Sequence, residues 1–126
     1  MVAFYKSLNM TVETVHQTAL KHDGGKTRLD LLPFDAVSEV ADVLAFGARK
    51  YAAHNWALGM QWSRLIGAAL RHIFAWAMGQ DKDPETGLSH LAHAGCCILF
   101  LIAYQRRGVG EDDRFKVPAP PEGAPS

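Results

Sequence analysis

An uninterrupted apolar run from Ala94 to Tyr104 constrains the fold more than any other feature of this sequence. On a helix, which turns by about 100° per residue, residues 98–102 would cover the whole circumference. A helix that is apolar all round has to be buried all round, so we expect it at the centre of a helical domain. The run is too short for a membrane span, which needs about 20 such residues.

Four polar side chains lie directly before this apolar run, and the packing of a buried helix does not explain them. Asp83 and Glu85 lie in a polar connection, and His90 and His93 follow three residues apart on one edge of the expected helix. A lone histidine there would be an ordinary buried hydrogen-bonding residue. Two histidines one turn after two acids leave metal ligation and phosphate binding open as alternatives.

The rest of the chain predicts further helices and no strands. Apolar positions recur at steps of three and four, and Pro33, Ser63 and Gly79 are residues that suit helix ends. We therefore expect three helices, over residues 9–22, 33–52 and 64–78. The apolar run forms a fourth, from about 86–89 to 108. No segment alternates as a strand does. We therefore predict an all-α, four-helix domain over residues 1–107, followed by a disordered tail over 108–126 that is rich in proline from Pro118.

Composition excludes several classes of function. Lys plus Arg equals Asp plus Glu at 13 each, so no excess charge favours nonspecific binding to nucleic acid or to an anionic membrane. The N-terminal residues lack the pattern of a secretory signal. The two cysteines are adjacent, at 96 and 97, which disfavours a disulfide between them. We therefore expect a cytoplasmic protein without a membrane or nucleic-acid partner.

The second expected helix carries acids on one face, with Glu39 and Asp42 three residues apart. Acids on a helix are usually solvated, but Phe46 interrupts this face. Side chains at i and i+3 can point at one ion, so Glu39 and Asp42 form a second candidate metal-binding pair.

Other polar residues are candidates for substrate binding. Lys26 and Arg28, in a glycine-rich loop without P-loop spacing, and Arg71 suit phosphate contacts. An indole, an amide and neighbouring polar groups can stack on and read a purine, or can simply pack a loop. These candidates follow the acidic helix: Lys50, Tyr51, Asn55 and Trp56. His72 is either a buried hydrogen-bonding residue or part of the site.

Taken in order, these segments resemble a known family. The blocks GGKTRLDLLP, EVADVLAFGARKY, NW, LRH and DPETGLSHLAHAGC, which together span about residues 21–107, resemble the phage dATP/dGTP diphosphohydrolases. These are MazG-like all-α nucleotide pyrophosphohydrolases, found among other places in phages that replace adenine with 2-aminoadenine. The resemblance implies a helical bundle completed by oligomerisation, as a dimer or a dimer of dimers.

The resemblance also implies a reaction and a set of ligands. MazG-like enzymes hold two or three Mg²⁺ or Mn²⁺ ions between an ExxE pair and a later ExxD pair. Glu39 and Asp42 match the first pair, with Asp in place of the second Glu, while His90 and His93 stand where the later acids are expected. Asp83 and Glu85 are then the acids nearest to hand, and histidine would suit Mn²⁺ or Co²⁺ better than Mg²⁺.

The implied activity is conversion of dGTP, with GTP and dATP as further candidates, to the monophosphate and pyrophosphate. In a 2-aminoadenine pathway the dGMP would feed precursor synthesis. Two alternatives stay open. A histidine–aspartate metal enzyme using His72, His90 and His93 would remove the whole triphosphate, and a non-catalytic helical module would only bind a nucleotide or partner.

Overall fold

The computed structural model describes residues 17–123, and these residues are all-α, as predicted. They form a 3₁₀ helix η1 (Leu29–Leu31), then α3 (Phe34–Lys50), a 3₁₀ helix η2 (Asn55–Leu58), α4 (Trp62–Ala77) and α5 (His90–Arg107). The described residues contain no β-strand, only two isolated bridges, Gln61–Glu111 and Lys82–Ser89. Within the same residues, no helix has both the length and the apolar character needed to cross a bilayer.

The chain divides into two units, residues 1–31 and 32–126. In the first unit, the glycine turn is closed by a hydrogen bond from Lys26 N to Asp23 O of 3.1 Å. Of the expected helix over 9–22, residues 9–16 lie outside the described part of the chain, and residues 17–22 are not helical, so there the prediction is wrong. Residues 17–22 are exposed, and an isolated short helix without a packing partner is marginal in water.

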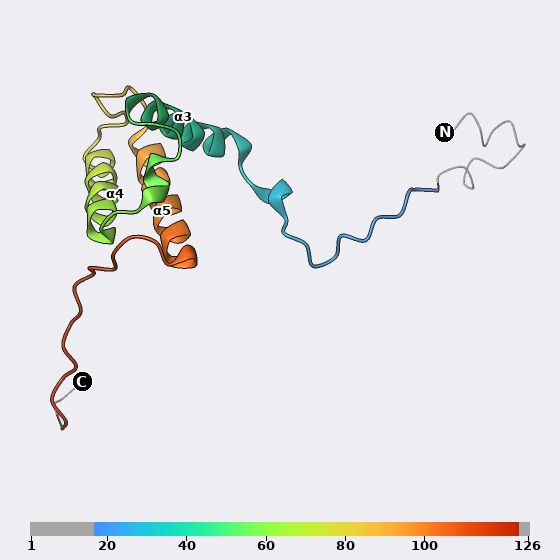
Figure 1. Cartoon of the computed structure of the whole chain (residues 1–126). Coiled ribbons are helices and arrows are strands. Elements are labelled where there is room, and N and C mark those ends of the chain that lie inside the picture. The colour runs from blue at the N-terminus through green and yellow to red at the C-terminus, as the bar shows by residue number, and fades with distance from the viewer. Residues whose placement is uncertain (1–16, 124–126) are drawn as a thin grey trace, which may run out of the picture. The chain divides into compact units, whose positions relative to one another are not determined.

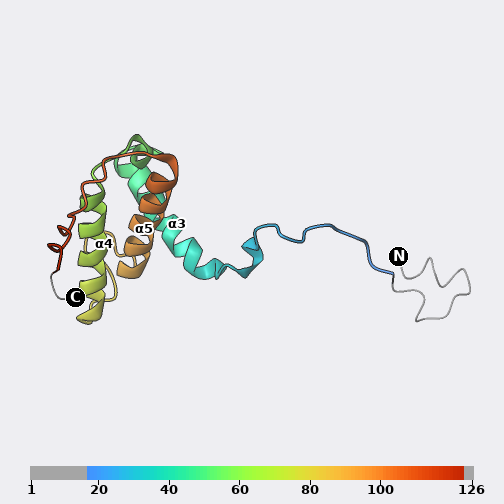
Figure 2. The same ribbon diagram turned by 90° about the horizontal axis from the view of Figure 1, so that it is seen from below.

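In the second unit, α5 is the central helix, as the apolar run predicts, but the prediction that it is buried all round is wrong, since Ile98, Leu99 and Ile102 are exposed. It packs along α4 and against α3 and η2. Figures 1 and 2 show α4 and α5 side by side, with α3 crossing at one end of the pair. Two groups of buried residues on α5 face these neighbours. Cys97 and Tyr104 pack with Leu65 and Ala69 of α4. Ala92 and Cys96 pack with Val43 of α3.

The ends of α5 lie where the sequence predicts them, near residues 89 and 108. Ser89 is the N-cap residue, and its hydroxyl accepts hydrogen bonds from the Leu91 and Ala92 backbone N–H groups. Gly108, at φ 67°, ends the helix in the left-handed conformation that glycine adopts without strain. Helix α3 also ends close to the expected position, at Lys50 rather than residue 52.

The prediction that Ser63 caps α4 is wrong. The helix already begins at Trp62, with Gln61 as an N-cap residue whose side chain makes no capping hydrogen bond. The acceptor comes instead from Asp113, whose carboxylate accepts from Ser63 N at 2.8 Å and from Ser63 Oγ at 2.5 Å. A carboxylate that follows α5 therefore closes the first turn of α4.

The segment that follows α5 packs against the start of α4. Val109 joins the apolar cluster around Tyr104, and its carbonyl accepts from Trp62 Nε1 at 3.0 Å. The Arg114 guanidinium lies 5.2 Å from the centre of the Trp62 ring. Contacts thus continue past the expected domain boundary at residue 107. The disorder of the proline-rich part stays a prediction.

Candidate functional site

A mostly apolar cavity of about 720 Å³ opens between α3, α5 and the connections that join the helices. This volume is within the usual range for small-molecule sites, roughly 300–1,000 Å³. Its apolar walls come mainly from α3, η2 and α5, including Val43, Leu44, Phe46, Trp56, Met60, Cys96, Cys97, Leu99 and Phe100. The polar part of the lining includes Lys50, Tyr51, His54, Asn55, His72, Asp83, Glu85, Thr86 and His93.

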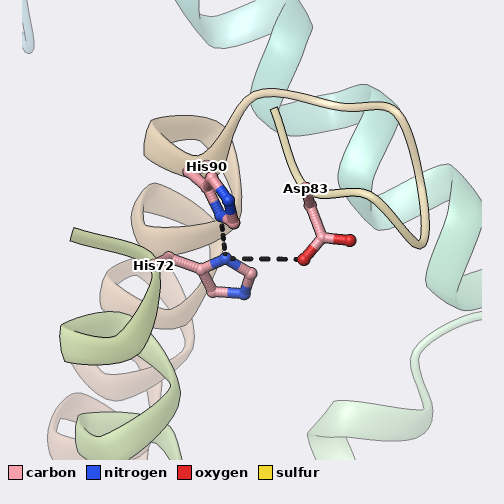
Figure 3. A group of neighbouring side chains, drawn as sticks. All are labelled: His72, Asp83 and His90. Carbon is pink, nitrogen blue, oxygen red and sulfur yellow. Dashed lines mark hydrogen bonds and ion pairs between the residues drawn. The ribbon is translucent and has the colours of Figure 1, made fainter. Parts of the chain in front are cut away.

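Three histidines and one aspartate meet beside this cavity: His72, His93 and Asp83 line it, whereas His90 is buried and does not. His72 comes from α4, His90 and His93 from the first turn of α5, and Asp83 from the connection between these helices (Figure 3 shows all but His93). His72 Nδ1 lies 2.8 Å from His90 Nδ1 and 3.8 Å from Asp83 Oδ2. The fold therefore brings four of the sequence-predicted site residues together.

His90 and His93 each contact a specific polar side chain. His90 is buried, and its Nε2 lies 2.7 Å from Gln80 Oε1. The His93 ring stacks on His72 with centroids 4.5 Å apart, and His93 Nε2 lies 2.7 Å from Thr86 Oγ1. Gln80 and Thr86 were not singled out from the sequence. Both residues lie in the connection before α5, where helical periodicity does not apply, so no sequence signal identifies them.

Burial and charge keep this group in a defined protonation state. Burial, followed by the nearby His93, lowers the pKa of His72, and burial also lowers the pKa of His93. For Asp83, burial acts to raise the pKa, but hydrogen bonds from the Thr86 and Glu85 backbone N–H groups help to bring it below its ordinary value. Near neutral pH His72 and His93 are thus neutral imidazoles beside the Asp83 carboxylate, and these are the forms that ligate metals.

The cysteines of the cavity wall are not activated nucleophiles. Burial and the neighbouring Cys97 raise the pKa of Cys96 to about 12, and burial also raises the pKa of Cys97. Thiols in this state are protonated at neutral pH and behave as small apolar groups.

The residues expected to bind a base do lie at this cavity. Lys50, Tyr51, Asn55 and Trp56 all contribute to its lining. Trp56 also packs within the domain, since its ring stacks on Phe100 at 4.7 Å and its carbonyl accepts a hydrogen bond from the Tyr104 hydroxyl. Lys50 Nζ reaches Glu85 Oε1 at 3.2 Å, which links the end of α3 to the connection that carries Asp83.

The remaining candidates lie away from the cavity or in the other unit. Glu39 and Asp42 are exposed and do not line the cavity. At 100° per residue, Glu39 shares the stripe of α3 that bears Val43 and Lys50, both of which do. Arg71 is exposed, with its guanidinium folded back beside Gly67. In the first unit Lys26 is exposed, and Arg28 pairs with Asp30 at 2.8 Å.

The fold and this site define an all-α domain with a ligand-sized cavity whose polar wall gathers imidazole and carboxylate groups. Residues 16–114 match the family described as dATP/dGTP diphosphohydrolase, N-terminal, and the chain belongs to that family, as its sequence blocks predict.

A curated relative carries the same description. The chain is 38% identical over 104 residues to the dATP/dGTP diphosphohydrolase of Salmonella phage PMBT28. The matched region is 82% of this chain and 36% of the relative, so the chain spans about a third of the length of that protein. No solved structure matches the chain.

Proposed function

We propose that this protein is a metal-dependent nucleoside triphosphate pyrophosphohydrolase that converts dGTP to dGMP and pyrophosphate, with GTP and dATP as further substrates. The observation that carries this proposal is the cavity with its histidine–aspartate wall, in a chain of the dATP/dGTP diphosphohydrolase family. The name of the Salmonella phage relative supports a purine deoxynucleoside triphosphate as substrate. In a phage that uses 2-aminoadenine, the dGMP formed would supply precursor synthesis.

The residues divide between the phosphates and the base. Trp56 and Asn55 suit the base, because an indole stacks on a purine and an amide can read its edge. Lys26, Arg28, Lys50 and Arg71 suit the triphosphate as cations, and Tyr51 and His72 suit it as hydrogen-bonding groups. Charge that develops on the leaving pyrophosphate would be stabilised by the same cations.

Divalent ions are the cofactors of this proposal. Two or three Mg²⁺ or Mn²⁺ ions, with Co²⁺ as a substitute, would be held by Glu39, Asp42, Asp83, Glu85, His90 and His93. Ions held there supply charge neutralisation on the triphosphate and a water of lowered pKa. The imidazole donors fit Mn²⁺ and Co²⁺ better than Mg²⁺, which prefers oxygen ligands.

One observation favours a second candidate function. His72, Asp83 and His90 lie within ligand distance of one another, whereas Glu39 and Asp42 are exposed on α3. A histidine–aspartate centre would suit an enzyme that removes the whole triphosphate and leaves deoxyguanosine.

Product analysis separates these functions. The purified chain is incubated with dGTP and either Mn²⁺ or Mg²⁺, and the products are resolved by anion-exchange chromatography. We expect dGMP and pyrophosphate in equal amounts. Deoxyguanosine with inorganic triphosphate would reject the proposal in favour of the second candidate. Unchanged dGTP with either ion would reject both and leave a non-catalytic nucleotide-binding module.

A further inference from the structure

The geometry points to a single cation site formed by His72, Asp83 and His90, built for a transition-metal ion such as Co²⁺, Zn²⁺ or Mn²⁺ rather than for Mg²⁺ (Figure 3). One atom of each residue lies within 4.8 Å of the other two. This site changes two assignments of the proposed function: His72 becomes a ligand instead of a substrate-binding group, and His93 lies beside the ion without binding it. The inference deepens the proposed function, because His72 and Asp83 also line the cavity, but its tests require no nucleotide.

Gln80 prepares His90 for this role. The amide oxygen Oε1 can only accept, so His90 Nε2 carries the proton that it donates to Gln80 at 2.7 Å. In a neutral imidazole the other nitrogen then bears a free lone pair, and His90 Nδ1 is the atom that faces His72. A histidine ligand held in one tautomer by an outer hydrogen bond is the usual arrangement in metal sites.

The two imidazole nitrogens converge at a separation that suits one ion. His72 Nδ1 and His90 Nδ1 are 2.8 Å apart. Two nitrogens that each bind an ion at about 2.1 Å lie roughly 3 Å apart when they subtend a right angle at it, so little movement is needed. Without an ion, the contact forms only if His72 Nδ1 carries a proton. To bind an ion through Nδ1, His72 takes the other neutral tautomer, with its proton on Nε2.

The connection between α4 and α5 aims the third ligand. Asp83 Oδ1 accepts from the backbone N–H groups of Glu85 at 2.8 Å and Thr86 at 3.1 Å. These two bonds fix the carboxylate and leave Oδ2 directed at His72 Nδ1, 3.8 Å away. The backbone thus orients this oxygen as Gln80 orients His90.

His93 supports the site without joining it. Its Nε2 is engaged by Thr86 Oγ1 at 2.7 Å, and its ring lies nearly parallel to that of His72, at 8°. A phenylalanine at this position would keep the stacked ring and lose the nitrogen. The substitution His93→Phe therefore tests whether this residue only stacks on His72 or also binds the ion.

Co²⁺ binding to the full chain tests the site. After treatment with a chelator, the protein is titrated with Co²⁺ and its visible d–d absorption is recorded. With a large excess of Mg²⁺ present to occupy the carboxylate sites, we expect one Co²⁺ per chain to be retained. His72→Ala and His90→Ala should each weaken Co²⁺ binding by more than about 100-fold. His93→Phe and His22→Ala should retain the spectrum. An unchanged spectrum in both alanine variants, or displacement by Mg²⁺, would overturn the inference.

Gln80 is a positioning residue, and its variants test the outer hydrogen bond. Gln80→Leu should weaken Co²⁺ binding by about 10- to 100-fold, and Gln80→Glu, which keeps an acceptor, should restore it. Equal affinities for Gln80→Leu and the unsubstituted protein would contradict the role assigned to Gln80.

A measurement on the unsubstituted protein covers the case in which a variant does not fold. In protein labelled with ¹⁵N at histidine, long-range ¹H–¹⁵N spectra distinguish Nδ1 from Nε2. Zn²⁺ should shift the Nδ1 signals of two histidines, both of which then carry a protonated Nε2. Shifts at Nε2, or none, would reject the site. If Co²⁺ binds as expected but dGTP is not turned over, the site stands and the proposed function falls.

Discussion

Glu39 offers the sharpest test of the acidic pair on α3. Its carboxylate is exposed, but it shares a stripe of the helix with Val43 and Lys50 of the cavity lining. If it holds an ion with Asp42, Glu39→Gln removes a ligand and a charge together and should lower kcat for dGTP by about 10³-fold or more. Turnover and circular dichroism are measured together, with Glu122→Gln as the control. A folded Glu39→Gln protein of near-normal activity would refute the assignment.

Trp56 belongs both to the cavity and to the packed interior. Trp56→Ala should raise KM for dGTP more than it lowers kcat, because stacking on a base changes little as the phosphate reacts. It should also lower Tm, since the stack on Phe100 is lost. Trp76, which is 45% exposed and lies outside the cavity lining, provides the control variant Trp76→Ala. An unchanged KM in a destabilised protein would restrict Trp56 to packing.

At the scale of the elements, the histidines between α4 and α5 couple stability to pH. Burial lowers the pKa values of His72 and His93, so below about pH 6.5 the unfolded chain binds more protons than the folded one. Stability is then highest above that pH and falls as the pH falls through the lowered pKa values. Urea unfolding at about pH 7.5, 6.5 and 5.5 should show a falling free energy of unfolding.

A variant identifies the group responsible for this dependence. His72→Gln should flatten the pH dependence between about pH 7.5 and 5.5, whereas His22→Gln, at an exposed position, should leave it unchanged. The slope is compared rather than the absolute stability, because His72→Gln also removes a hydrogen bond. Equal slopes in all three proteins would assign the dependence to other groups.

The helices were predictable because their signals are local. The periodicity of α3, the cap at Ser89 and the glycine at 108 all act within a few residues of the helix end they define. The end of α4 that meets Asp113 was mispredicted, because that contact joins residues 50 apart in the chain. The same limit applies to the site. The sequence singled out Asp83, His90 and His93 as candidates, but the hydrogen bond of Gln80 appears only once the chain has folded.

For the whole molecule, exposed apolar side chains on the two long helices bear on assembly. They include Leu70, Ile73 and Phe74 on α4 and Leu91, Ile98 and Ile102 on α5, and Phe74 is 64% exposed. Isolated chains rarely leave this much apolar surface uncovered. We expect these faces to pack across a two-fold axis, in a dimer or a dimer of dimers.

Light scattering tests this assembly. The unsubstituted protein should have the mass of a dimer or tetramer at micromolar concentration. Phe74→Lys should shift it toward the monomer, and Phe115→Lys, at a position 87% exposed and beyond the packed segment, should not. A monomer in the unsubstituted protein would contradict the expectation.

The packing of the chain around Gly110 sets a limit on sequence divergence. Gly110 adopts φ 79°, and a Cβ there would collide with the Met60 carbonyl oxygen, while a Cβ on Gly59 would come within 3.0 Å of a Val109 methyl. Neither position can accept alanine without separating the two backbone segments. In a library of all single substitutions, Gly110 should therefore tolerate as little as a core residue, although it is exposed to solvent. Solvent accessibility alone would rank this position as freely variable, and the close approach of two backbones makes it one of the least variable.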